Sequence, residues 1–136
     1  MMDARFLLDT NTCIYIRRHQ PPQVVARFRQ LKMGEAVLSV ITYGELLYGA
    51  EKSAARARAF RELEEIAGLL RVLPLPEDAA RLYGSIRAAL ETRGEIIGSN
   101  DLWIAAHAKA MNLTLVTNNE REFKRVAGLK VQNWIN

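Results

Sequence analysis

The sequence has one cysteine, Cys13, and no long apolar run. A single thiol cannot form an internal disulfide, which favours a reducing compartment. No apolar stretch approaches the ~20 residues that a membrane-spanning helix requires, so no membrane association is expected. The first residues also lack the charged start and long apolar middle of a secretory signal peptide. These absences predict a cytoplasmic protein.

The sequence also lacks linkers, internal repeats, low-complexity segments and hairpin signals. Its 136 residues are 49% apolar and 25% charged, a balance typical of globular proteins. A chain of this length can bury a substantial core without disulfides or metals as staples. We therefore expect residues 1–136 to form a single domain.

Basic residues outnumber acidic ones by 19 to 15, which gives a formal net charge of +4. Arginine supplies 14 of the 19 basic residues. Because a guanidinium group can bind two phosphate oxygens at once, this composition suits a nucleic-acid partner. A basic surface that serves only solubility fits the charge equally well.

Five short apolar segments are predicted to be strands. They are Arg5–Leu8, Ala36–Ser39, Leu69–Leu73, Thr114–Thr117 and Lys130–Trp134. The segments between them carry apolar residues at helical spacing, with Asn11 and either Ser99 or Asn100 as expected helix N-caps. Strands that alternate with helices, without hairpins, favour an α/β class with a mainly parallel sheet of four or five strands, covered on both faces.

Three acidic residues occupy unusual positions. Asp9 follows the first strand, and open α/β sheets bind ligands beyond the carboxyl ends of their strands. Glu45 falls in an otherwise apolar helical stripe, where a buried carboxylate needs a partner. Asp101 falls in the first turn of an apolar, alanine-rich helix. The simpler alternatives are a Glu45 that reaches solvent and an Asp101 that only favours the helix dipole.

If these three carboxylates converge, they require a cation or protons. Two like charges 4 Å apart repel by about 4 kcal/mol at an effective dielectric constant of 20. Carboxylate ligands without His or Cys select Mg²⁺ or Mn²⁺, which bind phosphate oxygens and activate water. Beside an arginine-rich surface, Asp9, Glu45 and Asp101 therefore predict metal-dependent phosphodiester hydrolysis. His107 is expected to be a packed histidine outside this site.

Four motifs follow one another along the chain. They are Leu7-Leu8-Asp9-Thr10-Asn11, Tyr43-Gly44-Glu45-Leu46, Asn100-Asp101-Leu102 and Leu115-Val116-Thr117-Asn118-Asn119. Together they resemble PIN-domain proteins of the VapC type, the toxins of bacterial type II toxin–antitoxin pairs, over essentially the full chain. The resemblance implies a PIN-like three-layer α/β/α fold and a Mg²⁺- or Mn²⁺-dependent endoribonuclease that cuts a tRNA or ribosomal RNA.

The resemblance also implies roles for individual residues. It places the metal-binding acids at Asp9 and Asp101, with Glu45 as the third carboxylate. The small polar residues around them fall at Thr10, Asn11, Thr117 and Asn119.

The fourth acid of many family members is replaced here by Asn119, so one metal held by the protein and a second recruited by the substrate are expected. Glu120 or Glu122 could substitute, although Glu122 is expected to support the local turn instead.

The resemblance further implies a homodimer and a VapB-type antitoxin, in a heterotetramer or a larger complex. We expect an apolar antitoxin helix to bind a groove around Ile14, Val25, Phe28 and the helix face of Phe60. The alternative to a ribonuclease is a PIN-like module that binds RNA or protein without cutting, which Asn119 alone favours.

Overall fold

The computed structural model describes residues 3–135 and contains a five-stranded sheet. Its strands are β1 (Phe6–Leu8), β2 (Ala36–Ser39), β3 (Arg71–Leu73), β4 (Thr114–Val116) and β5 (Val131–Gln132). They lie in the order β3-β2-β1-β4-β5, and every neighbouring pair is parallel. The predicted α/β class with a parallel sheet is confirmed.

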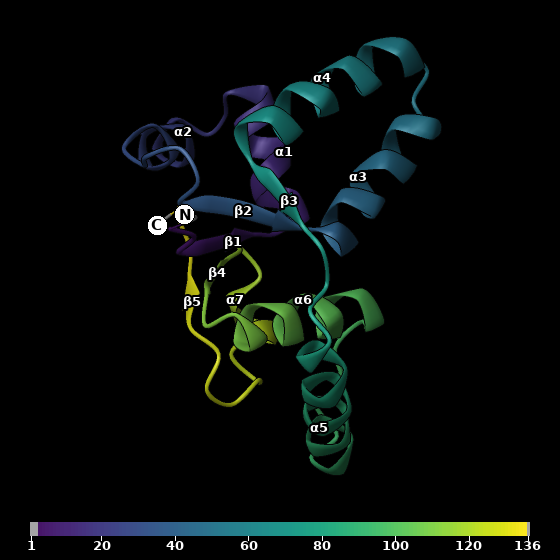
Figure 1. Cartoon of the computed structure of the whole chain (residues 1–136). Coiled ribbons are helices and arrows are strands. Elements are labelled where there is room, and N and C mark those ends of the chain that lie inside the picture. The colour runs from purple at the N-terminus through teal and green to yellow at the C-terminus, as the bar shows by residue number, and fades with distance from the viewer. Residues whose placement is uncertain (1–2, 136) are drawn as a thin grey trace.

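Seven helices connect these strands within the described residues. They are α1 (Thr10–Arg18), α2 (Pro22–Arg29), α3 (Val40–Glu51), α4 (Arg56–Leu69), α5 (Asp78–Thr92), α6 (Ser99–Ala110) and α7 (Glu120–Phe123). Helices α1 to α4 lie on one side of the sheet, and α5 to α7 lie on the other (Figure 1). No helix among residues 3–135 is long and apolar enough to cross a membrane.

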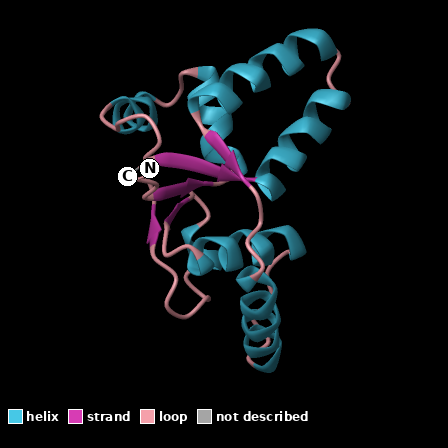
Figure 2. Cartoon of the chain, viewed as in Figure 1, coloured by secondary structure: helices cyan, strands magenta, loops and turns pink. Residues whose placement is uncertain are grey.

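The two helical layers bury two separate cores against the sheet. Successive side chains of a strand point to opposite faces. In β1, Leu7 accordingly packs with the α5–α7 core, whereas Phe6 and Leu8 pack with the α1–α4 core. Figure 2 shows how small the sheet is relative to the helices that cover it. The three-layer arrangement follows from this burial on both faces.

Several element ends differ from those that the sequence predicts. The segment Leu69–Leu73 begins as helix, because Leu69 completes the last turn of α4 and only Arg71–Leu73 pairs with β2. The terminal strand is short, because beyond Gln132 the chain turns and Trp134 packs edge-on against Phe6, with ring centroids 5.6 Å apart.

Two predicted helix caps are wrong, and both errors concern the site. Asp9, not Asn11, is the N-cap of α1, because the helix begins directly after the strand and the Asp9 carboxylate accepts from the Thr12 amide. Helix α6 begins after Gly98, without a side-chain cap. Ser99 and Asn100 are already helical, and their side chains contact Tyr83 and Glu45 instead.

The sheet order places the polar strand ends side by side. Leu8 of β1 lies opposite Val116 of β4, and the Asp9 amide donates to the Val116 carbonyl at 3.0 Å. Asp9 and Thr117 are therefore neighbours at the carboxyl edge of the sheet. On the other side of β1, β2 ends at Ser39 and leads into α3, which carries Glu45.

Candidate active site

Asp9 is a buried residue at the carboxyl end of β1, and only 7% of its surface is exposed. The Thr12 amide donates to its Oδ1 atom at 2.8 Å, and the Thr117 side chain is also hydrogen-bonded to it. Burial raises the pKa of Asp9, the hydrogen bonds of Thr117 and Thr12 oppose this rise, and the charge of Glu45 adds to it. The fold thus keeps a carboxylate in a place where its charge is costly.

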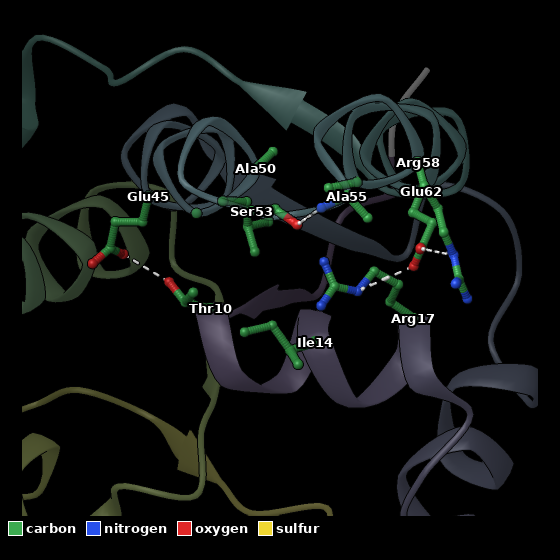
Figure 3. Close-up of a pocket in the computed structure, with 12 residues that line it drawn as sticks. Thr10, Ile14, Arg17, Glu45, Ala50, Ser53, Ala55, Arg58 and Glu62 are labelled. Carbon is green, nitrogen blue, oxygen red and sulfur yellow. Dashed lines mark hydrogen bonds and ion pairs between the residues drawn. The ribbon is translucent and has the colours of Figure 1, made fainter.

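Glu45 reaches across from α3 to the starts of α1 and α6. The Thr10 hydroxyl donates to its Oε1 atom at 2.7 Å, and the Asn100 amide donates to Oε2 at 3.5 Å (Figure 3 shows the first of these). Glu45 therefore does not extend into solvent from the edge of the apolar stripe. Its carboxylate is held between two of the motifs.

Asp101 lies in the first turn of α6, beside the other acids. Burial, followed in order of size by the charges of Glu45, Glu122 and Asp9, raises its pKa to about 6. Each of these carboxylates is thus close enough to disfavour ionisation of Asp101. The structure brings Asp9, Glu45 and Asp101 together, and we call them, with Glu122, the acid cluster.

Glu122, one of the two residues considered from the sequence as substitutes for the missing fourth acid, lies in the acid cluster. The Asn119 amide donates to its Oε2 atom at 2.9 Å, so Glu122 does support the turn as expected. Its charge also acts on Asp101, which the sequence does not show. The available signal was an acid three residues after Asn119 in a motif that normally supplies a fourth carboxylate.

The polar residues around the cluster differ in their contacts. Thr117 is buried, and its hydroxyl accepts from the backbone amide of Asn119 at 2.9 Å. Because Thr117 is also hydrogen-bonded to Asp9, these contacts hold the three residues in place. Asn11 is exposed and makes no side-chain hydrogen bond within the described part of the chain. Thr12, which the sequence analysis did not single out, binds both Asp9 and the Val116 carbonyl.

His107 lies outside the cluster, as expected. It is fully buried, and its Nδ1 atom lies 2.8 Å from the Ser39 hydroxyl. Burial lowers the pKa of His107 to about 4, so the ring is neutral at pH 7. This histidine is part of the packing between α6 and the end of β2.

The donor chemistry of the acid cluster fits a hydrated Mg²⁺ or Mn²⁺ ion. Among residues 3–135, no three His, Cys, Asp or Glu side chains are gathered tightly enough to enclose one ion. Magnesium ions usually take only one or two protein carboxylates and keep several waters. Asp9 and Asp101 could supply such oxygen ligands, and Glu45 could bind through water. A cation would also relieve the mutual repulsion that raises their pKa values.

A hollow of about 300 Å³ opens beside the cluster between α1, α3 and α4 (Figure 3). Thr10 and Glu45 lie at one end. At the other end, Glu62 pairs with Arg17 at 3.5 Å and with Arg58 at 3.2 Å. The hollow therefore connects an acidic end with a mixed-charge end.

The raised pKa of Asp101 predicts a specific pH dependence of stability. The unfolded chain releases this proton near pH 3.8, whereas the folded protein keeps it until about pH 6. Between these values the folded state binds more protons, so this residue makes the free energy of unfolding fall as pH rises. The stability difference between the parent and Asp101→Asn, from urea unfolding without divalent metal, should follow this fall and level off above pH 7. A difference that is constant from pH 4 to 7 would contradict the burial of Asp101 among charges.

Comparison with protein families matches residues 6–129 to the PIN domain. The chain belongs to the PIN-domain family. Among PIN-domain relatives, ribonuclease VapC2 of Haemophilus influenzae is 41% identical over 131 residues, which cover 96% of this chain and 98% of that protein. The tRNA(fMet)-specific endonuclease VapC of Shigella flexneri is 42% identical over 130 residues, with the same coverage. The resemblance drawn from the four motifs is confirmed.

Solved structures of VapBC complexes share the fold. A DNA-bound VapBC from Salmonella typhimurium superposes with a TM-score of 0.90 at 40% identity and covers 96% of this chain and 98% of that one. VapBC2 from Rickettsia felis, bound to a promoter DNA fragment, gives a TM-score of 0.89 at 38% identity, with 95% and 98% covered. The expected PIN-like three-layer α/β/α architecture is confirmed.

Proposed function

We propose that this protein is a metal-dependent endoribonuclease and the toxin of a type II toxin–antitoxin pair. The observation that carries the proposal is the convergence of Asp9, Glu45 and Asp101 in a chain related to VapC ribonucleases over nearly its whole length. Because one relative is named as a tRNA(fMet)-specific endonuclease, initiator tRNA is the first substrate to test. Residues 1–136 would form one PIN domain that acts in the cytoplasm.

The residues in and around the acid cluster would have different roles in hydrolysis. Asp9 and Asp101 would bind Mg²⁺ or Mn²⁺, with Glu45 as the third carboxylate. When bound, the metal would activate water and offset the charge that develops on the phosphate. Thr117 favours the ionised form of Asp9 through its hydrogen bond, and Thr10 fixes the orientation of Glu45.

The region around Asn119 completes the proposed site. Asn119 orients Glu122, so the fourth carboxylate comes from α7 rather than from position 119 itself. Glu122 adds negative charge beside Asp101. The protein itself would hold one metal, and a second would be recruited with the substrate. Asn11, which is exposed at the start of α1, would contact the substrate.

A VapB-type antitoxin is the proposed protein partner, as in the related VapBC structures. An apolar hollow of about 210 Å³ lies between α1, α2 and α4, and Val25 and Phe28 line it. Ile14 lines the neighbouring 300 Å³ hollow that leads to Glu45, whereas Phe60 lines neither. An antitoxin helix on this surface can therefore reach the acid cluster. We also propose a homodimer, with the antitoxin in a heterotetramer or a larger complex.

The proposed function predicts that the purified protein cuts initiator tRNA in the presence of Mg²⁺ or Mn²⁺. A chelator should abolish cleavage, and added metal should restore it, because hydrolysis requires the metal to activate water. Denaturing gels of end-labelled tRNA would show one or a few internal cuts, and a DNA strand of matching sequence serves as control. Binding of tRNA without cleavage under every metal condition would instead establish the non-catalytic binding module.

A further inference from the structure

A hollow beside α7 is lined almost entirely by basic side chains. It has a volume of about 470 Å³ and is lined by Arg93, Glu95, Arg121, Lys124 and Arg125, and we call it the basic groove. None of these residues belongs to the acid cluster or to the two hollows near α1. The question is what such a groove binds.

The two walls of the basic groove are tied together by hydrogen bonds. One wall is the connection between α5 and α6, and the other is α7 with the turn that follows. Arg93 donates through Nη2 to the Arg125 carbonyl at 2.7 Å, and Arg125 donates through Nη1 to the Ile96 carbonyl at 3.1 Å. These reciprocal bonds hold the walls at a fixed separation.

The cations of the groove are only partly neutralised by the protein. Arg93 pairs with Glu95 at 2.7 Å, and Lys124 pairs with Glu120 at 3.6 Å, although the Lys124 side chain is 66% exposed. Arg121 is exposed and makes no ion pair within residues 3–135. Exposed ion pairs contribute little, so these cations stay available to an incoming anion. Four cations around one carboxylate favour a ligand with repeated negative charge.

Both walls of the groove lead directly into the acid cluster. The α5–α6 connection ends at Gly98, where a Cβ atom would lie 3.8 Å from Oδ2 of Asp101. On the other wall, Glu122 follows Arg121 in sequence, yet its charge acts on Asp101. Residues one position apart on a helix point about 100° away from each other, whereas residues three apart share a face. Arg121 and Lys124 can thus line the groove while Glu122 faces the cluster.

We propose that the basic groove binds the phosphate backbone of the RNA to one side of the scissile bond. This inference rests on the proposed ribonuclease function. An acid cluster repels every phosphate that no cation neutralises, so a substrate strand needs positive charge where it leaves the cluster. The groove supplies that charge on the same two segments that carry Asp101 and Glu122. Because it contacts phosphates, it contributes affinity and register rather than choice of base.

The test compares two double variants that remove the same charge. The groove variant, Arg121→Ala with Lys124→Ala, removes two exposed cations of the groove. The control variant, Arg61→Ala with Arg81→Ala, removes two exposed arginines on α4 and α5. All are made in the Asp9→Asn background, so that labelled initiator tRNA is bound but not cut. Fluorescence anisotropy over a range of salt concentrations gives the affinity and its salt dependence, and thermal unfolding confirms that both variants fold.

The groove variant is expected to bind tRNA roughly tenfold more weakly, with the slope of log K against log salt reduced by about 2, one for each lost phosphate contact. In the α4 and α5 variant, the slope should change by less than half as much. With Asp9 intact, the groove variant should cut a short oligonucleotide that spans only the cleavage site as well as the parent does. On full tRNA, the same variant should show an unchanged kcat and a raised KM.

Equal tRNA affinity and equal salt slopes for the two double variants would overturn the assignment of the groove while cleavage by the parent still supported the ribonuclease function. If the groove variant loses affinity for an acidic antitoxin segment and none for tRNA, the groove is a protein-binding surface and the inference is wrong. A parent protein that neither binds nor cuts RNA would remove the proposed function itself, and the inference with it.

Discussion

Asp9→Asn is expected to lower tRNA cleavage by on the order of 10³-fold and to abolish growth arrest when the chain is expressed alone. Asparagine has nearly the same shape and keeps an oxygen that can accept from the Thr12 amide. It lacks the negative charge that would hold the metal. The loss should therefore appear in kcat, measured with saturating tRNA and Mg²⁺, far more than in KM.

Stability separates a catalytic role of Asp9 from a structural one. Burial raises the pKa of Asp9, so an ionised carboxylate at this position carries a free-energy cost in the folded protein. Asparagine removes that cost, and the variant should unfold at the same or a higher temperature than the metal-free parent. Added Mg²⁺ should raise the unfolding temperature of the parent alone, because a ligand that binds only the folded state stabilises it.

The matched control for this substitution is Asp78→Asn. Asp78 lies in the first turn of α5, is exposed, and has no place in the acid cluster. Its replacement should leave both cleavage and the Mg²⁺ response within about twofold of the parent, as expected for a surface site. Parent-like cleavage by Asp9→Asn, or equal losses in the two variants, would show that the acid cluster is not the catalytic centre.

The strands and the three central acids could be predicted because each left a local signal. Leu7 and Leu8 form an apolar run that the sheet buries completely, and Asp9 interrupts that run at the strand end. The predictions of the helix caps were wrong because they considered only residues that are close in sequence. The side-chain amide of Asn100 donates to Glu45, which lies 55 residues earlier, and no local sequence pattern shows that contact.

The direction of the Glu122 side chain and the existence of the basic groove could not be predicted, for the same physical reason. Helix α7 is four residues long, too short for a periodic pattern to show which way Glu122 points. Its direction depends on Phe123, which is buried in the α5–α7 core. Arg93 and Arg125 are 32 residues apart, and only the tertiary fold brings the end of α5 next to the turn that follows α7. Tertiary contacts, rather than sequence periodicity, create both features.

Phe28→Ala is expected to weaken binding of the VapB-type antitoxin by about 30- to 1000-fold, the loss typical of a central aromatic anchor. Phe28 lines the apolar hollow between α1, α2 and α4 and also a second, smaller hollow beside α2. An apolar antitoxin helix would bury this ring, and alanine would leave a gap in the contact. Isothermal titration with the purified antitoxin measures the loss, and co-expression should no longer protect cells.

Phe60→Ala is the matched control, because it removes the same side chain from the same helical layer. Phe60 packs against the α1–α4 core, its ring lies 4.9 Å from the Arg56 guanidinium carbon, and it lines neither hollow. Both substitutions remove partly buried rings and should cost comparable unfolding free energy in urea, so stability alone cannot separate them. Antitoxin affinity should separate them, because only Phe28 lines the hollow. The affinity of Phe60→Ala for the antitoxin should stay within about threefold of that of the parent. Equal affinities for the two variants, or a larger loss for Phe60→Ala, would place the antitoxin on a different face of the protein.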